Sequence, residues 1–214
     1  MQVKAEDKAK QKREIVQLRR LERMSDVVYA IVIWRIFILL PSLTAEHLRW
    51  EDFSNYLSAN VGTFLLVIIG VTVTIIYWLR NNLLLGNLQS TDTRHSALSI
   101  LQLFFLIVFL VSLRESITLG SSPVIRVIES SSAAMVGIAG GWSWVYAVKN
   151  HHLLLPEVTE QYALKIRDRT LAEPITAIIT IPMAFFGPYI WEISWLSYPL
   201  VVVFLKYRRM SIRE

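Results

Sequence analysis

The chain has 214 residues, of which 54% are hydrophobic and 18% are charged, and its formal net charge is +5. A soluble domain carries relatively more charge, and here the charges collect in short blocks between long apolar runs. The chain has no cysteine, which excludes disulfides and thiolate metal sites. Apolar runs of about 18 or more residues cross a bilayer as helices, and these runs lack the alternation of barrel strands. The composition therefore predicts an all-α, polytopic membrane protein.

Residues 1–26 are predicted to form a basic cytoplasmic arm with helical periodicity. Ile15, Leu18, Leu21 and Met24 recur at helical spacing among lysines and arginines. This charged lead is too long for an ordinary signal peptide and has no small-residue cleavage site, so we expect the first helix to remain as a span. The arm either continues that span into the cytoplasm or lies on anionic lipid. A solvated anchor on the positive side of the membrane is the favoured interpretation.

Six spans are predicted within residues 27–205. The first covers 27–40 and ends near Pro41, and a polar loop with His47, Glu51 and Asp52 follows it. The next three cover 61–79, 97–113 and 130–148, and a cytoplasmic linker occupies about 149–170. The last apolar stretch, 171–205, is too long for one span, and we expect Gly187-Pro188 to divide it by a tight turn.

The distribution of lysine and arginine predicts the orientation of these spans. With six spans, the basic arm, the linker and the tail 206–214 all lie on one side, while the opposite loops hold only Arg49 and Arg114. Cytoplasmic loops are enriched in basic residues, so both termini are predicted to be cytoplasmic. The net charge therefore indicates topology, and no nucleic-acid partner is expected.

The first span is unusual because it contains charge. Asp26 lies where the helix enters the membrane, and Arg35 lies near mid-depth, where an arginine costs about 2.5–3.5 kcal/mol on insertion scales. Ile31, Arg35 and Ile38 follow one another at i, i+4 and i+7 and share one helical stripe. This stripe is the best candidate for a pore or an oligomer axis.

Structural interpretations of the same two charges stay open. Arg35 is equally compatible with a structural ion pair, with Glu129 as a partner if it lies at matching depth, or with capping by backbone carbonyls. Asp26, with Ser25, suits a helix entry of the N-cap kind or an inter-helix salt bridge.

The fourth span carries small residues at four-residue spacing, Ala133, Gly137 and Gly141, which allow close helix packing. The hydroxyls of residues 130–132 are expected to bond back to their own helix more readily than to line a vestibule. Five tryptophans near predicted interfaces suggest aromatic belts: Trp78, Trp142, Trp144, Trp191 and Trp195.

No motif of catalysis or metal binding occurs in the sequence. The pair His151-His152 lacks a third ligand at metal spacing, and no phosphate loop, catalytic carboxylate pair or Ser/His/Asp arrangement is present. We therefore expect a protein that is not an enzyme and holds no cofactor.

The segment Arg20-Leu-Glu-Arg-Met-Ser25-Asp26 resembles the R-x-x-x-F-S-D signature that opens the first span of the transmembrane protein 175 family. That family comprises the endosomal and lysosomal potassium channel and its prokaryotic six-helix relatives. The likeness continues in Ala30-Ile31, in the segment from Tyr77 to Asn82, and in the basic linker before two tightly turned spans. It extends over most of the chain and implies an integral membrane protein of a prokaryotic cell membrane.

This resemblance implies a homotetrameric ion channel in which the first spans of four subunits line a central pore. Apolar rings on that span select the ion, and by position they correspond to Ile31, Arg35 and Ile38. The resemblance also implies that Arg20, Ser25 and Asp26 tie the first span to its neighbours. Trp78 and Asn81 are the implied partners for those hydrogen bonds.

Three positions depart from the family pattern. Met24 replaces a phenylalanine, Trp34 stands where threonine is frequent, and Arg35 replaces an apolar ring residue. Four guanidinium groups around a narrow axis would repel potassium, and arginine does not neutralise at ordinary pH.

Three functions remain in view at this point. The first is a potassium channel with Arg35 turned off the axis or ion-paired. The second is the same scaffold passing anions, or held shut, because Arg35 faces the axis. The third is a non-conducting membrane scaffold or sensor whose basic arm binds partners or lipid.

Overall fold

The computed structural model of the chain describes residues 2–44 and 49–211. Within these ranges almost every residue is helical, and the only β contact is an isolated bridge between Leu88 and Leu154. The predicted all-α class is therefore confirmed. The helices are α1 (Gln2–Phe37), α2 (Trp50–Leu85), α3 (Thr93–Leu119), α4 (Pro123–Lys149), η2 (His151–Leu153), α5 (Glu160–Met183), α6 (Pro188–Ser194), η3 (Trp195–Ser197) and α7 (Tyr198–Ser211).

Four of the described helical segments are long and apolar enough to cross a membrane. They are Trp50–Leu85, Thr93–Ser116, Pro123–Lys149 and Pro188–Arg208, and each contains one of the predicted spans. Helices α1 and α5 fall short of this criterion because charged residues interrupt them. The last 18 residues of α1 begin at Arg20 and include Glu22, Arg23, Asp26 and Arg35 as well, and in α5 the run from Arg167 to Glu173 is charged.

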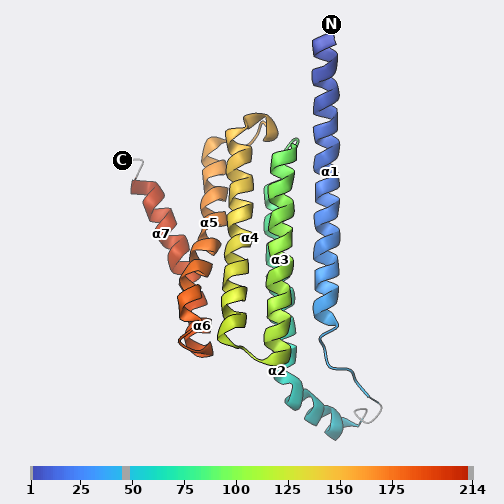
Figure 1. Cartoon of the computed structure of the whole chain (residues 1–214), viewed down its shortest axis with the longest axis vertical. Coiled ribbons are helices and arrows are strands. Elements are labelled where there is room, and N and C mark those ends of the chain that lie inside the picture. The colour runs from blue at the N-terminus through green and yellow to red at the C-terminus, as the bar shows by residue number, and fades with distance from the viewer. Residues whose placement is uncertain (1, 45–48, 212–214) are drawn as a thin grey trace.

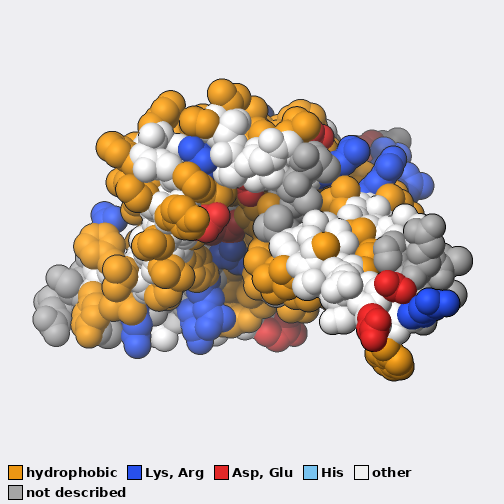
Figure 2. All heavy atoms as spheres, turned by 90° about the horizontal axis from the view of Figure 1, so that it is seen from below, with side chains coloured by type: hydrophobic (Ala, Val, Ile, Leu, Met, Phe, Trp, Pro, Cys, Tyr) orange, Lys and Arg blue, Asp and Glu red, His pale blue; other side chains and the backbone are white. Residues whose placement is uncertain are grey.

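The helices stand side by side and run alternately up and down, with α1 at one edge and α7 at the other (Figure 1). Helix α4 lies between α3 and α5 and is buried over much of its length. Many large apolar side chains on the outside of the helices are exposed, among them Ile68, Phe104 and Leu200, and the view from the end opposite the N-terminus shows apolar side chains over much of that face (Figure 2). This distribution is the one expected of a protein whose surrounding solvent is lipid.

The bundle has two apolar cores. One lies in its middle and includes Tyr29, Val67, Leu106 and Val136. The second lies at the end where the N-terminal arm emerges, and it joins α1 to the linker and to the turn between α2 and α3. It contains Leu18, Leu21, Leu84, Leu85, Leu88, Trp144, Ala147, Leu153, Leu154, Ala163 and Ile166.

The second core shows how the arm is attached to the bundle. Helix α1 passes residue 26 without a break, so the arm and the predicted first span form one helix, and Leu18 and Leu21 of the arm are packed while most of its other described side chains are exposed. Gln17 Nε2 donates to Ser96 Oγ over 3.0 Å, and the Thr91 N–H donates to the Glu14 carbonyl over 3.3 Å. These contacts hold the arm against the start of α3.

Some predicted boundaries are wrong by a few residues. The first helix ends at Phe37, before Pro41, while Glu51 and Asp52 belong to the first turn of α2 rather than to a loop. Carboxylates are stabilised there by the positive end of the helix dipole. The predicted loop residue His47 lies outside the described residues.

The predicted division of the last apolar stretch is confirmed. Helix α5 ends at Met183, and Gly187 turns the chain with φ of 112°, a conformation that disfavours residues with a side chain. Pro188 then opens α6, where a proline at the first position is well tolerated.

Candidate functional site: the outer face of the first helix

Helix α1 has one face turned to the rest of the molecule. Ser25, Tyr29, Val32 and Ile36 follow one another at spacings of three and four residues, and all four side chains are buried. They pack into the middle core against α2 and α3. This face fixes the rotation of α1 in the bundle.

The opposite face of α1 carries large apolar side chains that the rest of the described chain does not cover. Val27, Ile31, Trp34 and Ile38 are 57%, 55%, 67% and 56% exposed. Successive helical residues are about 100° apart around the axis, so these four lie within about 60° of one another. They form a single stripe, hereafter the outer stripe, at the edge of the bundle.

Arg35 lies beside the outer stripe rather than at its centre. Its position is about 80° round the helix from Val27, on the side that faces α3. It lines a groove of about 410 Å³ between the two helices together with Ile31 and, from α3, Ile107, Val111 and Arg114. Among the described residues no hydrogen bond or ion pair of Arg35 is found. The suggested partner Glu129 is buried in α4 and is in no ion pair with it.

The signature residues occupy both faces of α1. Asp26 is exposed, and its Oδ1 accepts a hydrogen bond of 2.8 Å from Trp78 Nε1 of α2. Ser25 and Asn81 are buried, 1% and 2% exposed, but Ser25 Oγ and Asn81 Nδ2 have no hydrogen-bond partner among the described residues. Arg20 is exposed on the arm. The structure thus contains one of the implied inter-helix contacts, that of Asp26 with Trp78.

A polar link between α2 and α5 was not foreseen from the sequence. Arg80 forms an ion pair with the buried Glu173, and its Nη2 donates to the Arg169 carbonyl over 2.6 Å. Pro174 follows Glu173 directly and lies against Gly137 of α4. A Cβ added at Gly137 would lie only 2.4 Å from Pro174 Cδ. The signal in the sequence was a lone acid within the fifth apolar stretch, which must find a cation.

The N-terminal end of α4 holds a second polar group. Arg126 is buried and donates from Nε to the Ala184 carbonyl over 3.0 Å, so it caps the turn after α5. Ser130 Oγ accepts hydrogen bonds from Thr180 and Trp191, at 2.8 and 2.9 Å. Ser132 instead donates back to the carbonyl of Ile128 within its own helix. These contacts are structural and bring no reactive group to the surface.

At the end of the bundle where the arm emerges, Asp92 caps α3. Its Oδ1 accepts from the His95 N–H over 2.8 Å, and its Oδ2 accepts from the Tyr146 hydroxyl over 2.5 Å. Partial burial acts to raise the pKa of Asp92, but these hydrogen bonds outweigh it and hold the pKa below the ordinary value of 3.8. His151 and His152 lie exposed in η2, and among the described residues no group of three metal-ligating side chains is found.

Comparison with known proteins adds no family assignment. A scan against family models finds none that matches the chain, and a search of curated proteins finds no match. The geometry of α1 and the resemblance of its signature therefore remain the two guides to function.

Proposed function

We propose that the chain is a membrane channel for potassium ions, in which four copies meet through the outer stripe of α1 around a central path. Six crossings, with both termini in the cytoplasm, belong to this proposal. The alternating direction of the helices and the positive-side bias of the loops support that topology. The resemblance to the transmembrane protein 175 family supports the ion and the number of subunits.

The observation that carries the proposal is a charged helix with one uncovered face. Helix α1 is too interrupted by charge to be a favourable lipid-facing span, yet its outer stripe is not covered by the described chain. Arginine within lipid costs about 2.5–3.5 kcal/mol on insertion scales, and such residues usually face protein or a water-filled path. Self-association through the stripe would cover its apolar side chains and bring the flank of α1 that carries Arg35 towards a neighbouring copy, without requiring a different partner.

The position of Arg35 favours cation conduction over the anion alternative. Because it borders the groove with α3, its guanidinium lies to the side of the surface on which the four copies meet. Ile31 and Ile38 then form the narrow apolar rings, and hydrophobic constrictions of this kind gate by dewetting. If Arg35 instead turned onto the axis, the same scaffold would pass anions or stay shut.

Reversal potentials distinguish these functions. We would reconstitute the purified protein in a planar bilayer under a potassium chloride gradient and compare the wild type with Arg35→Leu. Arg49→Leu is the matched control, because it removes an exposed arginine near the start of α2. We expect reversal near the potassium potential in the wild type and in both variants.

Two other results would replace the proposal. Reversal near the chloride potential, or current only in Arg35→Leu, would assign Arg35 to the axis and favour an anion-selective or closed channel. Absence of current in every variant, with the assembly intact by light scattering, would favour the non-conducting scaffold or sensor.

A further inference from the structure

The face of α1 that carries the outer stripe continues into the arm and becomes basic. Arg20 and Arg13 lie seven and fourteen residues before Val27, so they fall within about 40° of it around the helix axis. Ala9 and Val16 occupy the same face, and with Lys12, Gln17 and both arginines they line a shallow open hollow. The arm therefore presents guanidinium groups in line with the proposed path.

These arginines are fixed in place and not neutralised within the chain. The buried Leu18 and Leu21 hold the arm against the cytoplasmic core on the opposite side of α1. Among the described residues Arg13 and Arg20 are in no ion pair, whereas Lys10 pairs with Glu14 at 4.0 Å. Glu6, nearer the tip, is an exposed acid on the arm.

We propose that the arms of the assembled protein form a cytoplasmic site for a soluble polyphosphate anion, bound between the guanidinium groups of Arg13 and Arg20. This inference rests on the proposed function, because the assembly brings the arms together around one axis. A guanidinium group can donate two parallel hydrogen bonds to the oxygens of one phosphate. Several positive charges around one axis attract a multivalent anion more strongly than a single chloride.

The geometry favours a soluble anion over a lipid headgroup. The arm continues the membrane helix without a kink-forming residue, so it stands away from the membrane. At 1.5 Å per residue Arg13 lies about 20 Å beyond Asp26, outside the reach of headgroups, and Arg20 about 9 Å beyond it. Anionic lipid at Arg20 alone is the competing occupant, and the experiment below distinguishes it.

The test is calorimetric titration of inorganic tripolyphosphate into the purified protein in neutral detergent, with the mass of the assembly measured by light scattering. The double variant Arg13→Gln/Arg20→Gln should weaken binding at least about tenfold, because it removes both guanidinium groups from the axial face. The control Lys8→Gln/Arg19→Gln removes equal charge from a flank of the same helix, about 100–140° round the axis from Arg13 and Arg20, and should change the affinity less than about threefold.

Nanodiscs separate the two sources of phosphate. Tripolyphosphate should bind equally to the protein in nanodiscs of neutral lipid and in nanodiscs containing phosphatidylglycerol. Loss of binding only in the phosphatidylglycerol nanodiscs would show that lipid headgroups occupy the arginines, and it would overturn the proposal. Equal weakening by both double variants would also overturn it, as nonspecific attraction. If Arg13→Gln/Arg20→Gln does not fold, Arg13→Gln alone serves, since Arg13 is exposed.

The outcome separates this site from the channel itself. A four-chain mass without tripolyphosphate binding removes the anion site and leaves the channel proposal standing. A single-chain mass removes the assembly on which both depend. Where the anion binds, cytoplasmic tripolyphosphate should increase the potassium current, because it neutralises positive rings that repel the entering cation.

Discussion

At the residue scale, the contact between Asp26 and Trp78 fixes the point where α1 enters the bundle. The indole N–H donates to the carboxylate over 2.8 Å and joins α1 to α2. We predict that Trp78→Phe, which keeps the ring but removes the donor, lowers the free energy of unfolding by about 0.5–1.5 kcal/mol. Thermal unfolding in detergent, followed by circular dichroism, measures this change.

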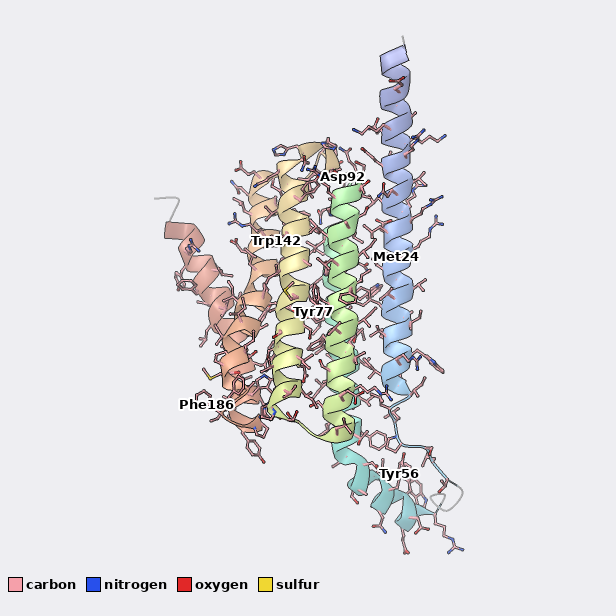
Figure 3. The ribbon with its side chains drawn as sticks, in the orientation of Figure 1. Met24, Tyr56, Tyr77, Asp92, Trp142 and Phe186 are labelled. Carbon is pink, nitrogen blue, oxygen red and sulfur yellow. The ribbon has the colours of Figure 1, made fainter. Side chains whose placement is uncertain are left out.

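A mutant cycle makes that prediction specific. Asp26→Ala and Trp78→Phe should be less than additive, because each removes the same bond. Trp142→Phe is the control, since Trp142 is exposed on α4 (Figure 3), and it should leave stability within about 0.5 kcal/mol. Strict additivity of Asp26→Ala and Trp78→Phe would show that the bond contributes nothing.

A second residue-scale prediction concerns acid stability at the cap of α3. The pKa of Asp92 is depressed in the folded chain, so its contribution is fully present above the unfolded pKa and is lost as pH falls through the folded value. The affected window therefore lies at and below about pH 4. Tyr146→Phe removes one of the hydrogen bonds to Asp92 and should raise the midpoint pH of acid unfolding. An unchanged midpoint would mean that the His95 N–H alone sets the carboxylate's pKa.

Sequence reasoning at this scale identified residues that share a helix face, but not what those residues contact. The tryptophans near predicted interfaces were expected to form belts, and Trp142 is indeed exposed, but Trp144 and Trp191 are buried with their N–H groups bonded inside the protein. Periodicity identifies which residues share a face of one helix. It does not identify what faces them, which is also why the groove between Arg35 and α3 was not predicted.

At the element scale, the contact between α4 and α5 depends on a missing side chain. Gly137 lies against Pro174, and an added Cβ would be only 2.4 Å from its Cδ. We predict that Gly137→Ala forces the helices apart and costs about 1–3 kcal/mol of stability. Gly62→Ala is the matched control, because no atom of the described chain lies within 4 Å of a Cβ there.

The control Gly62→Ala should leave the free energy of unfolding unchanged or raise it slightly, since alanine is favoured over glycine inside a helix by up to about 1 kcal/mol. Comparing thermal midpoints of the two variants therefore separates packing from propensity. Equal midpoints would show that α4 and α5 accommodate the methyl group by sliding, and that the close approach is not required.

Element positions were largely predictable because the length of an apolar run is a direct physical signal. The turn at Gly187 and the close packing at Gly137 both followed from local residue chemistry. The packing of the arm did not, because Leu18 and Leu21 meet residues of the linker more than a hundred positions away. The ion pair of Arg80 with Glu173 is distant in sequence in the same way.

At the scale of the whole molecule, cysteine chemistry tests whether the outer stripe is an interface. The chain has no cysteine, so a single introduced thiol reacts without background. In the proposed assembly Ile31 of neighbouring chains converges on one axis, whereas Ile68 of α2 faces lipid although it is as exposed, at 61% against 55%. We predict that mild oxidation of Ile31→Cys in membranes yields covalent pairs of chains and that Ile68→Cys does not.

The product must be a pair even in a tetramer, because each thiol forms one bond, and a disulfide requires Cα atoms within about 7 Å. A wide water-filled path would exceed that distance, so a short bismaleimide is used in parallel to span it. Ile31→Cys should form covalent pairs of chains with one of the two reagents, and so should Ile38→Cys, about two helical turns further along the chain. Both results together would place the outer stripe on a shared axis. If Ile68→Cys formed pairs as readily as Ile31→Cys, or if Ile31→Cys formed pairs with neither reagent, the outer stripe would face lipid. The cost of placing Arg35 beside that stripe would then need another explanation.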